Sequence, residues 1–137
     1  RENWDEIYRL LEELRKKIKK AQEEDTKGLN RKTQMPIYRK LNALVYDKKD
    51  NPTDDEVNNL LIWTKEIYGM LKIELALIGF WNNPASVARL RGEISNYIAS
   101  ECHSIPTAFS KRNEIAQEVL AWAKDERITS AIIYSED

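Results

Sequence analysis

The sequence predicts an all-α protein: a single compact domain of about five helices around a long central helix, without a regular coiled coil. Apolar residues recur three and four positions apart over most of the chain, the spacing of one face of an α-helix. Proline, asparagine and threonine stand where helices characteristically begin. A length of 137 residues is typical of one domain. We therefore assign residues 1–137 to a single helical domain.

A first helix is expected over residues 3–25, with one apolar stripe along its length. The stripe consists of Trp4, Ile7, Leu11, Leu14, Ile18 and Ala21. It covers fewer heptads than the three or four that indicate a coiled coil. We expect the stripe to be buried within the protein's own domain, and binding to a partner helix is the alternative.

The next two helices are separated by polar loops. Pro36 suits the first position of a short helix that extends to about Tyr46, followed by a loop over residues 47–52. The segment from Thr53 to Glu56 has the pattern of a capping box, which begins a third helix that extends to about Ile78. The second half of this helix is apolar on nearly all sides. It is therefore expected to be the central helix, surrounded by the others.

The segment Phe80-Trp81-Asn82-Asn83-Pro84 predicts a corner between two helices, because Asn83 and Pro84 suit the start of a fourth helix. We expect Phe80 and Trp81 to cover the core at this corner, or else to form a partner-docking patch. A ligand site is disfavoured because no convergent set of polar or titratable groups accompanies the pair in sequence. Further along, Pro106 interrupts the helices, a fifth helix is expected over about 110–126, and residues 128–137 form either an extra turn or a strand.

The composition argues against catalysis and against a bound metal or cofactor. Cys102 and His103 are the only residues of their kinds, and adjacent residues seldom form a nucleophile–base pair. A metal site needs more such ligands, and no glycine-rich phosphate loop is present. One cysteine favours a reducing compartment, and no apolar run reaches the length of a membrane span. We therefore expect a cytoplasmic protein without a membrane contact. Because the chain starts at Arg1 and not at Met, we expect a fragment of a larger protein.

The basic residues are concentrated in one part of the chain. Residues 1–50 carry four more basic than acidic residues, whereas residues 51–137 carry five more acidic than basic ones. The segment 27–49 contains seven basic residues and one acid, Asp47. Such asymmetry indicates a polyanion or an acidic partner surface. The candidate DNA contacts are Lys27, Arg31, Lys32, Arg39, Lys40, Lys48 and Lys49. Tyr38 and Tyr46 lie among them, either to stack on bases or as edges of the core.

A second run of basic residues lies on the first helix, at Lys16, Lys17, Lys19 and Lys20. Glu12, Glu13, Glu23 and Glu24 lie within helical pairing distance of this run, which favours a solvated helix face over a nucleic-acid contact. These four lysines are therefore second-tier candidates for DNA binding.

The order of these features resembles the C-terminal helical region of the R (motor) subunit of type I restriction-modification enzymes. The resemblance rests on the acidic start at 53–56, Thr64-Lys65-Glu66-Ile67, the corner at 80–84, Leu90-Arg91, and Phe109, Arg112, Ile115, Val119 and Leu120. The opening segment ENWDEIYRLLEELRKKI is similar to the helical start of that region.

This resemblance implies a non-catalytic domain that docks the motor subunit onto the methyltransferase core and contributes a basic surface to the path of double-stranded DNA. Its partners would be the methyltransferase and specificity subunits and the rest of the motor subunit. The parent subunit would be an ATP-dependent type I site-specific deoxyribonuclease, whose nuclease and ATPase motifs are missing from this sequence. The alternative is a helical protein–protein interaction module without a role in nucleic-acid binding.

Overall fold

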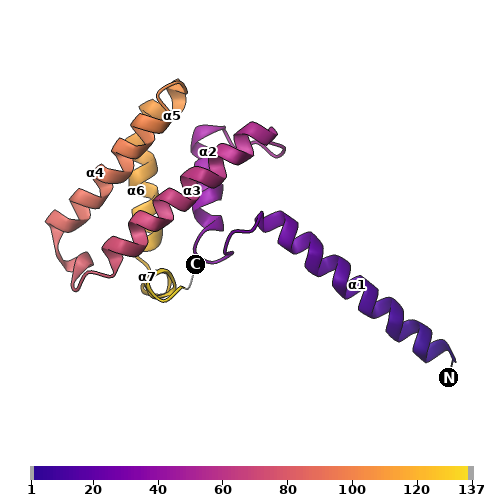
Figure 1. The fold of residues 1–137 in the computed structure, drawn as a ribbon. Coiled ribbons are helices and arrows are strands. Elements are labelled where there is room, and N and C mark those ends of the chain that lie inside the picture. The colour runs from indigo at the N-terminus through magenta and orange to yellow at the C-terminus, as the bar shows by residue number, and fades with distance from the viewer. Residues whose placement is uncertain (1, 136–137) are drawn as a thin grey trace. The chain divides into compact units, whose positions relative to one another are not determined.

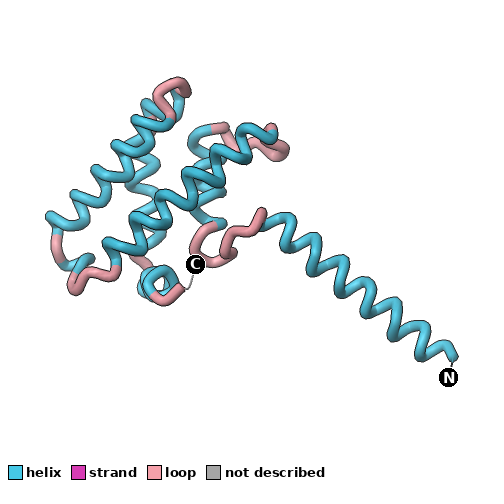
Figure 2. Tube along the Cα trace, in the orientation of Figure 1, coloured by secondary structure: helices cyan, strands magenta, loops and turns pink. Residues whose placement is uncertain are grey.

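The predicted all-α class is confirmed. The computed structural model describes residues 2–135, except for the side chains of residue 2 and residues 19–25. Over these residues the chain forms seven α-helices and one 3-10 helix, and no strand is found (Figure 2). Contacts within the chain divide it into two units, residues 1–30 and residues 31–137.

The first unit consists of α1, Glu2–Thr26 (Figure 1). Lys27 and Gly28 follow with φ angles of 52° and 81°, so the helix ends in a left-handed turn, which glycine adopts readily. The described large apolar side chains of the stripe are about half exposed or more, from Trp4 at 74% to Ile7 at 47%. Whether this stripe packs into the protein's own domain stays a prediction.

The second unit contains the other helices. They are α2 (Met35–Val45), α3 (Asp54–Leu75), the 3-10 helix η1 (Phe80–Asn82), α4 (Pro84–Glu101), α5 (Pro106–Ser110), α6 (Arg112–Ala123) and α7 (Glu126–Ile133). Helix α3 contacts α2, α4 and α7, and α6 contacts α4, α2 and α7. The core of this unit is formed by α3, α6 and the helices that contact them.

Helix α3 is the central helix that its composition predicts. Leu60, Ile67 and Leu71 are completely buried. Isoleucines and leucines of the other helices in this unit also have no exposed surface and form the rest of its core. These are Ile37, Leu41, Leu90, Ile94, Ile98, Ile115 and Ile132. One face of α3 nevertheless stays exposed at Ile62 and Ile73, so its neighbours do not enclose it on every side.

The capping box at the start of α3 forms as predicted. The Thr53 hydroxyl accepts a hydrogen bond from the Glu56 backbone N–H at 3.2 Å, and the Glu56 carboxylate accepts one from the Thr53 N–H at 2.9 Å. At the far end, α3 stops at Leu75, a few residues before the expected boundary. Gly79 then adopts a φ of 68° and begins the corner that carries Phe80 and Trp81.

Two segments near the C-terminus are helical, the expected break around Pro106 and the tail, whose structure the sequence left open. Pro106 occupies the first turn of the five-residue helix α5, a position that tolerates a residue without an N–H. Residues 126–133 form α7 and not a strand, and the Asp125 side chain caps this helix by accepting a hydrogen bond from the Arg127 N–H at 2.9 Å. Residues 136 and 137 of the tail lie outside the described residues. Ile132 of this helix is completely buried, so the tail belongs to the packed unit.

Candidate functional site

Helix α2 and the loops on either side of it carry six of the seven predicted DNA contacts. Arg31 and Lys32 precede the helix, Arg39 and Lys40 lie on it, and Lys48 and Lys49 follow it. Five of these six side chains are exposed, and Lys40 is half-buried. Arg31, Lys32, Arg39 and Lys48 are hereafter called the α2 basic surface, which leaves out Lys49 because it forms an ion pair with Glu56.

The backbone around the α2 basic surface is anchored at both ends of the helix. Thr33 and Gln34, which follow the first pair of cations, are buried. In the second loop, the Lys48 N–H donates to the Asn42 carbonyl at 3.0 Å, and the Asn42 side chain donates to the Lys49 carbonyl at 3.0 Å. These contacts hold the backbone of the loops, which carries the cations, close to α2.

Two of the predicted contacts are engaged in ion pairs within the unit. Lys49 Nζ lies 2.8 Å from a carboxylate oxygen of Glu56, and this contact lowers the pKa of Glu56. Lys40 Nζ lies 3.7 Å from Glu118 on α6, and the Lys40 side chain is only 28% exposed. Both lysines therefore have a local partner whose charge offsets their own, and they are weaker candidates for phosphate contacts than Arg39 or Lys48.

The two tyrosines near the basic residues belong to the core and its edge. Tyr38 is 6% exposed. Tyr46 stacks on Trp63 with 6.0 Å between ring centroids, and its hydroxyl accepts a hydrogen bond from Asn59 at 3.3 Å. Of the two interpretations left open by the sequence, base stacking and core edge, the structure supports the second.

The remaining candidates lie in the first unit. Lys16 and Lys17 are exposed on α1, and Lys27 is exposed in the turn after it. The side chains of Lys19 and Lys20 lie outside the described residues.

Phe80 and Trp81 have different surroundings, although they are adjacent. Phe80 is 3% exposed and belongs to the core, as the corner interpretation predicts. Trp81 is half-buried and meets Phe80 edge-on, with 4.9 Å between ring centroids. The Trp81 indole N–H donates to the Thr129 hydroxyl of α7 at 3.0 Å, and that hydroxyl donates to the Ala123 carbonyl at 2.6 Å.

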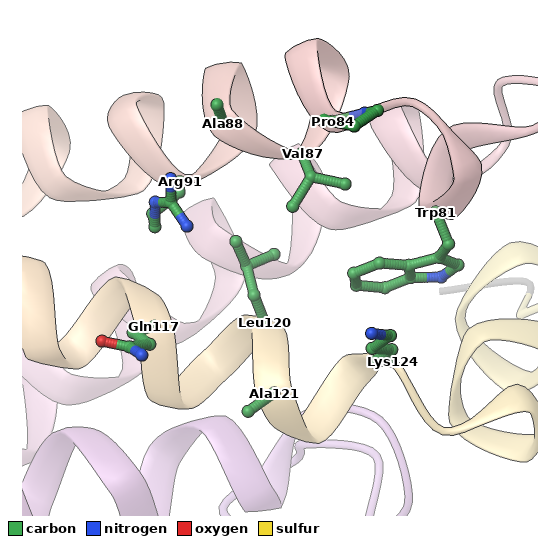
Figure 3. Close-up of a pocket in the computed structure, with 9 residues that line it drawn as sticks. All are labelled: Trp81, Pro84, Val87, Ala88, Arg91, Gln117, Leu120, Ala121 and Lys124. Atoms are coloured by element: carbon green, nitrogen blue, oxygen red, sulfur yellow. The ribbon is translucent and has the colours of Figure 1, made fainter.

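Trp81 also lies at one end of a groove of about 410 Å³ between α4 and α6 (Figure 3). The groove is lined by Trp81, Pro84, Val87, Ala88 and Arg91 from the corner and α4, and by Gln117, Leu120, Ala121 and Lys124 from the α6 side. The sequence gives no sign of cations near Trp81 because those of this groove are ten and more residues away along the chain. Only the antiparallel contact between α4 and α6 brings them together.

The cysteine and the histidine do not form a reactive pair. Cys102 is completely buried, and burial raises the pKa of its thiol to about 11. The His103 ring nitrogen Nδ1 lies 3.0 Å from the Ser100 carbonyl oxygen. Among the described residues, no three side chains of His, Cys, Asp or Glu come together as metal ligands. No described helix combines the length and the apolar character that crossing a membrane requires.

Comparisons with models of known protein families, with curated proteins and with solved structures find no match.

Proposed function

We propose that this chain is a non-catalytic DNA-contact and assembly domain of a cytoplasmic type I restriction enzyme motor subunit. The observation that carries the DNA contact is the α2 basic surface. Arg31, Arg39 and Lys48 are exposed there, and none of the three forms an ion pair with another described residue. Exposed cations without an acidic partner can neutralise phosphates and so release the counterions that are condensed on the DNA.

The length of helix α2 is comparable with a short stretch of DNA backbone. Helix α2 has 11 residues and is therefore about 16 Å long. That length corresponds to about five phosphates along one strand, which rises about 3.4 Å per nucleotide. Cations before, on and after the helix can thus meet several phosphates without reading the base sequence, so the contact would be non-specific.

The assembly role is proposed from the resemblance in sequence to the motor subunit family. The partners would be the methyltransferase and specificity subunits and the remainder of the motor subunit. In this role the domain needs no catalytic residue of its own, metal or cofactor. Its contribution would be to hold the motor against the methyltransferase core while the α2 basic surface lies along the DNA path.

Salt-dependent binding to duplex DNA tests the proposal. The affinity of the chain for a duplex of arbitrary sequence is measured by fluorescence anisotropy at several salt concentrations. The variant Arg31→Ala/Arg39→Ala/Lys48→Ala is expected to bind more weakly and to have a shallower plot of log K against log salt. The loss of three phosphate contacts reduces the slope by about 2.7, since each contact contributes about 0.9.

A matched control removes the same number of exposed cations elsewhere in the second unit. The variant Lys65→Ala/Arg91→Ala/Lys124→Ala carries the same net charge change but leaves α2 and its loops intact. It is expected to keep nearly the parental slope. Equal slopes for the two triple variants would show that binding follows net charge alone and would refute a contact surface at α2. No binding at low salt would refute the DNA role altogether.

Helix α1 favours a second candidate function, that of a helical protein–protein interaction module without a nucleic-acid role. Leu11 and Leu14 are 59% and 54% exposed on the apolar stripe. Such a stripe suits binding to the apolar face of another helix. This function predicts partner binding that persists at high salt and is lost in Leu11→Glu/Leu14→Glu, whereas Lys16→Glu/Lys17→Glu on the same helix retains it.

A further inference from the structure

The groove between α4 and α6 has a regular composition. Its α4 wall consists of Pro84, Val87, Ala88 and Arg91. Its α6 wall consists of Gln117, Leu120, Ala121 and Lys124. In both walls the residues are separated by three, four and seven positions, so each wall is one face of two helical turns, about 10 Å long.

A cation lies at each end of the groove. Each wall has its basic residue at its C-terminal end, and α4 and α6 run in opposite directions. Arg91 therefore lies with Gln117 at one end of the groove, and Lys124 lies with Trp81 at the other end (Figure 3). Both basic side chains are exposed. Neither forms an ion pair with another described residue, although Arg89 nearby is paired with Glu74 at 2.8 Å. The groove therefore has two positive ends whose charge is not offset.

The part of the groove between the two cations is apolar and rigid. Val87 and Leu120 face each other across it, and the six-membered ring of Trp81 points into it (Figure 3). The hydrogen bond from the Trp81 indole to Thr129 and the edge-on contact with Phe80 fix the orientation of the ring. A preformed apolar surface of this kind can receive an apolar side chain without first having to rearrange.

We propose that this groove binds a two-turn acidic amphipathic helix of a partner protein. In this helix, two carboxylates seven residues apart meet Arg91 and Lys124, and apolar side chains three and four residues after the first carboxylate enter the space between Trp81, Val87 and Leu120. The helix repeats the spacing of both walls, as in other complexes in which an amphipathic helix lies in a groove.

The charge and the lining together favour this ligand over nucleic acid. A phosphate backbone would satisfy Arg91 and Lys124 but would leave the half-buried side chains of Val87 and Trp81 without an apolar partner. This site is distinct from the α2 basic surface, and its ligand does not depend on whether the chain binds DNA.

Titration with a designed peptide, followed by NMR of the isotope-labelled chain, tests the proposal. The probe is an alanine-based helical peptide with glutamates seven residues apart and leucines three and four residues after the first glutamate. The expected result is a set of shifts confined to α4, α6 and the Trp81 indole N–H. The charge-reversal variant Arg91→Glu/Lys124→Glu is expected to bind the probe at least about 10-fold more weakly, because two attractions become repulsions.

A peptide with lysine in place of both glutamates provides the reciprocal control. It should bind the charge-reversal variant better than the parent chain, a gain that a misfolded variant could not produce. Lys65→Glu, a charge reversal on the exposed side of α3, should leave binding of the original probe unchanged. Shifts outside the groove, equal binding of the two peptides by the parent chain, or groove shifts caused by duplex DNA would each overturn the proposal.

Discussion

Replacing Lys48 by glycine should have opposite effects on stability and on DNA binding. Lys48 has a φ of 55° and follows Asp47, whose φ is 56°, so two consecutive residues without glycine's freedom adopt the left-handed conformation. This conformation costs an ordinary residue about 1–2 kcal/mol. Glycine avoids that cost but loses about 0.5–1 kcal/mol through the greater freedom of the unfolded chain. The expected net effect of Lys48→Gly is a gain of about 0.5–1 kcal/mol in the free energy of unfolding.

Lys48→Ala is the control that separates the backbone from the charge. It removes the same cation but keeps a Cβ atom, so it should not gain stability. Both variants should lower the slope of log K against log salt by about 0.9, the contribution of one phosphate contact. Urea unfolding followed by circular dichroism gives the stability, and anisotropy at several salt concentrations gives the slope.

Each half of this reasoning can be refuted separately. If Lys48→Gly is no more stable than Lys48→Ala, the loop does not hold residue 48 in the left-handed region. If both variants keep the parental slope, Lys48 does not contact DNA, whatever their stability. A reduced slope for glycine alone would indicate that the loop conformation and not the charge determines binding.

Three further predictions concern groups whose surroundings the structure defines. Cys102 is buried, and the pKa of its thiol is raised to about 11. A thiol reagent at neutral pH should therefore modify Cys102 rapidly only after denaturant has unfolded the chain. Equally rapid modification of the native chain would contradict the burial of Cys102. Thr129→Val leaves the Trp81 indole N–H without its hydrogen-bond acceptor, so urea titrations should show a free energy of unfolding lower by about 1–2 kcal/mol. No loss of stability would show that this hydrogen bond is not maintained in solution. The hydrogen bond from Lys49 lowers the pKa of Glu56 in the folded chain. The ionised Glu56 carboxylate therefore stabilises the fold at pH values above its pKa in the unfolded chain, and this contribution is lost as the pH falls through its pKa in the folded chain. Glu56→Gln should reduce the acid dependence of stability, and an unchanged pH profile of stability would refute this linkage.

Local sequence determined the helices and their starting points. The capping box at Thr53 and the pairing of Asn83 with Pro84 each involve residues at most three positions apart, so their interactions are the same wherever the helix lies in the fold. The burial of Leu60 and Ile67 likewise follows from helical periodicity. Local signals were weaker for α5 and α7, which are short helices stabilised mainly by contacts with other helices.

Tertiary structure decided which charges have partners and which side chains share a surface. Lys40 and Lys49 look equivalent to Arg39 and Lys48 in the sequence, but Glu118 and Glu56 offset the charge of the first two. Arg91 and Lys124 line one groove with Trp81 only because α4 and α6 pack side by side in opposite directions. Helical spacing thus fixed which face each residue occupies, whereas the pairing of faces depends on contacts between residues far apart in the chain, which no local pattern encodes.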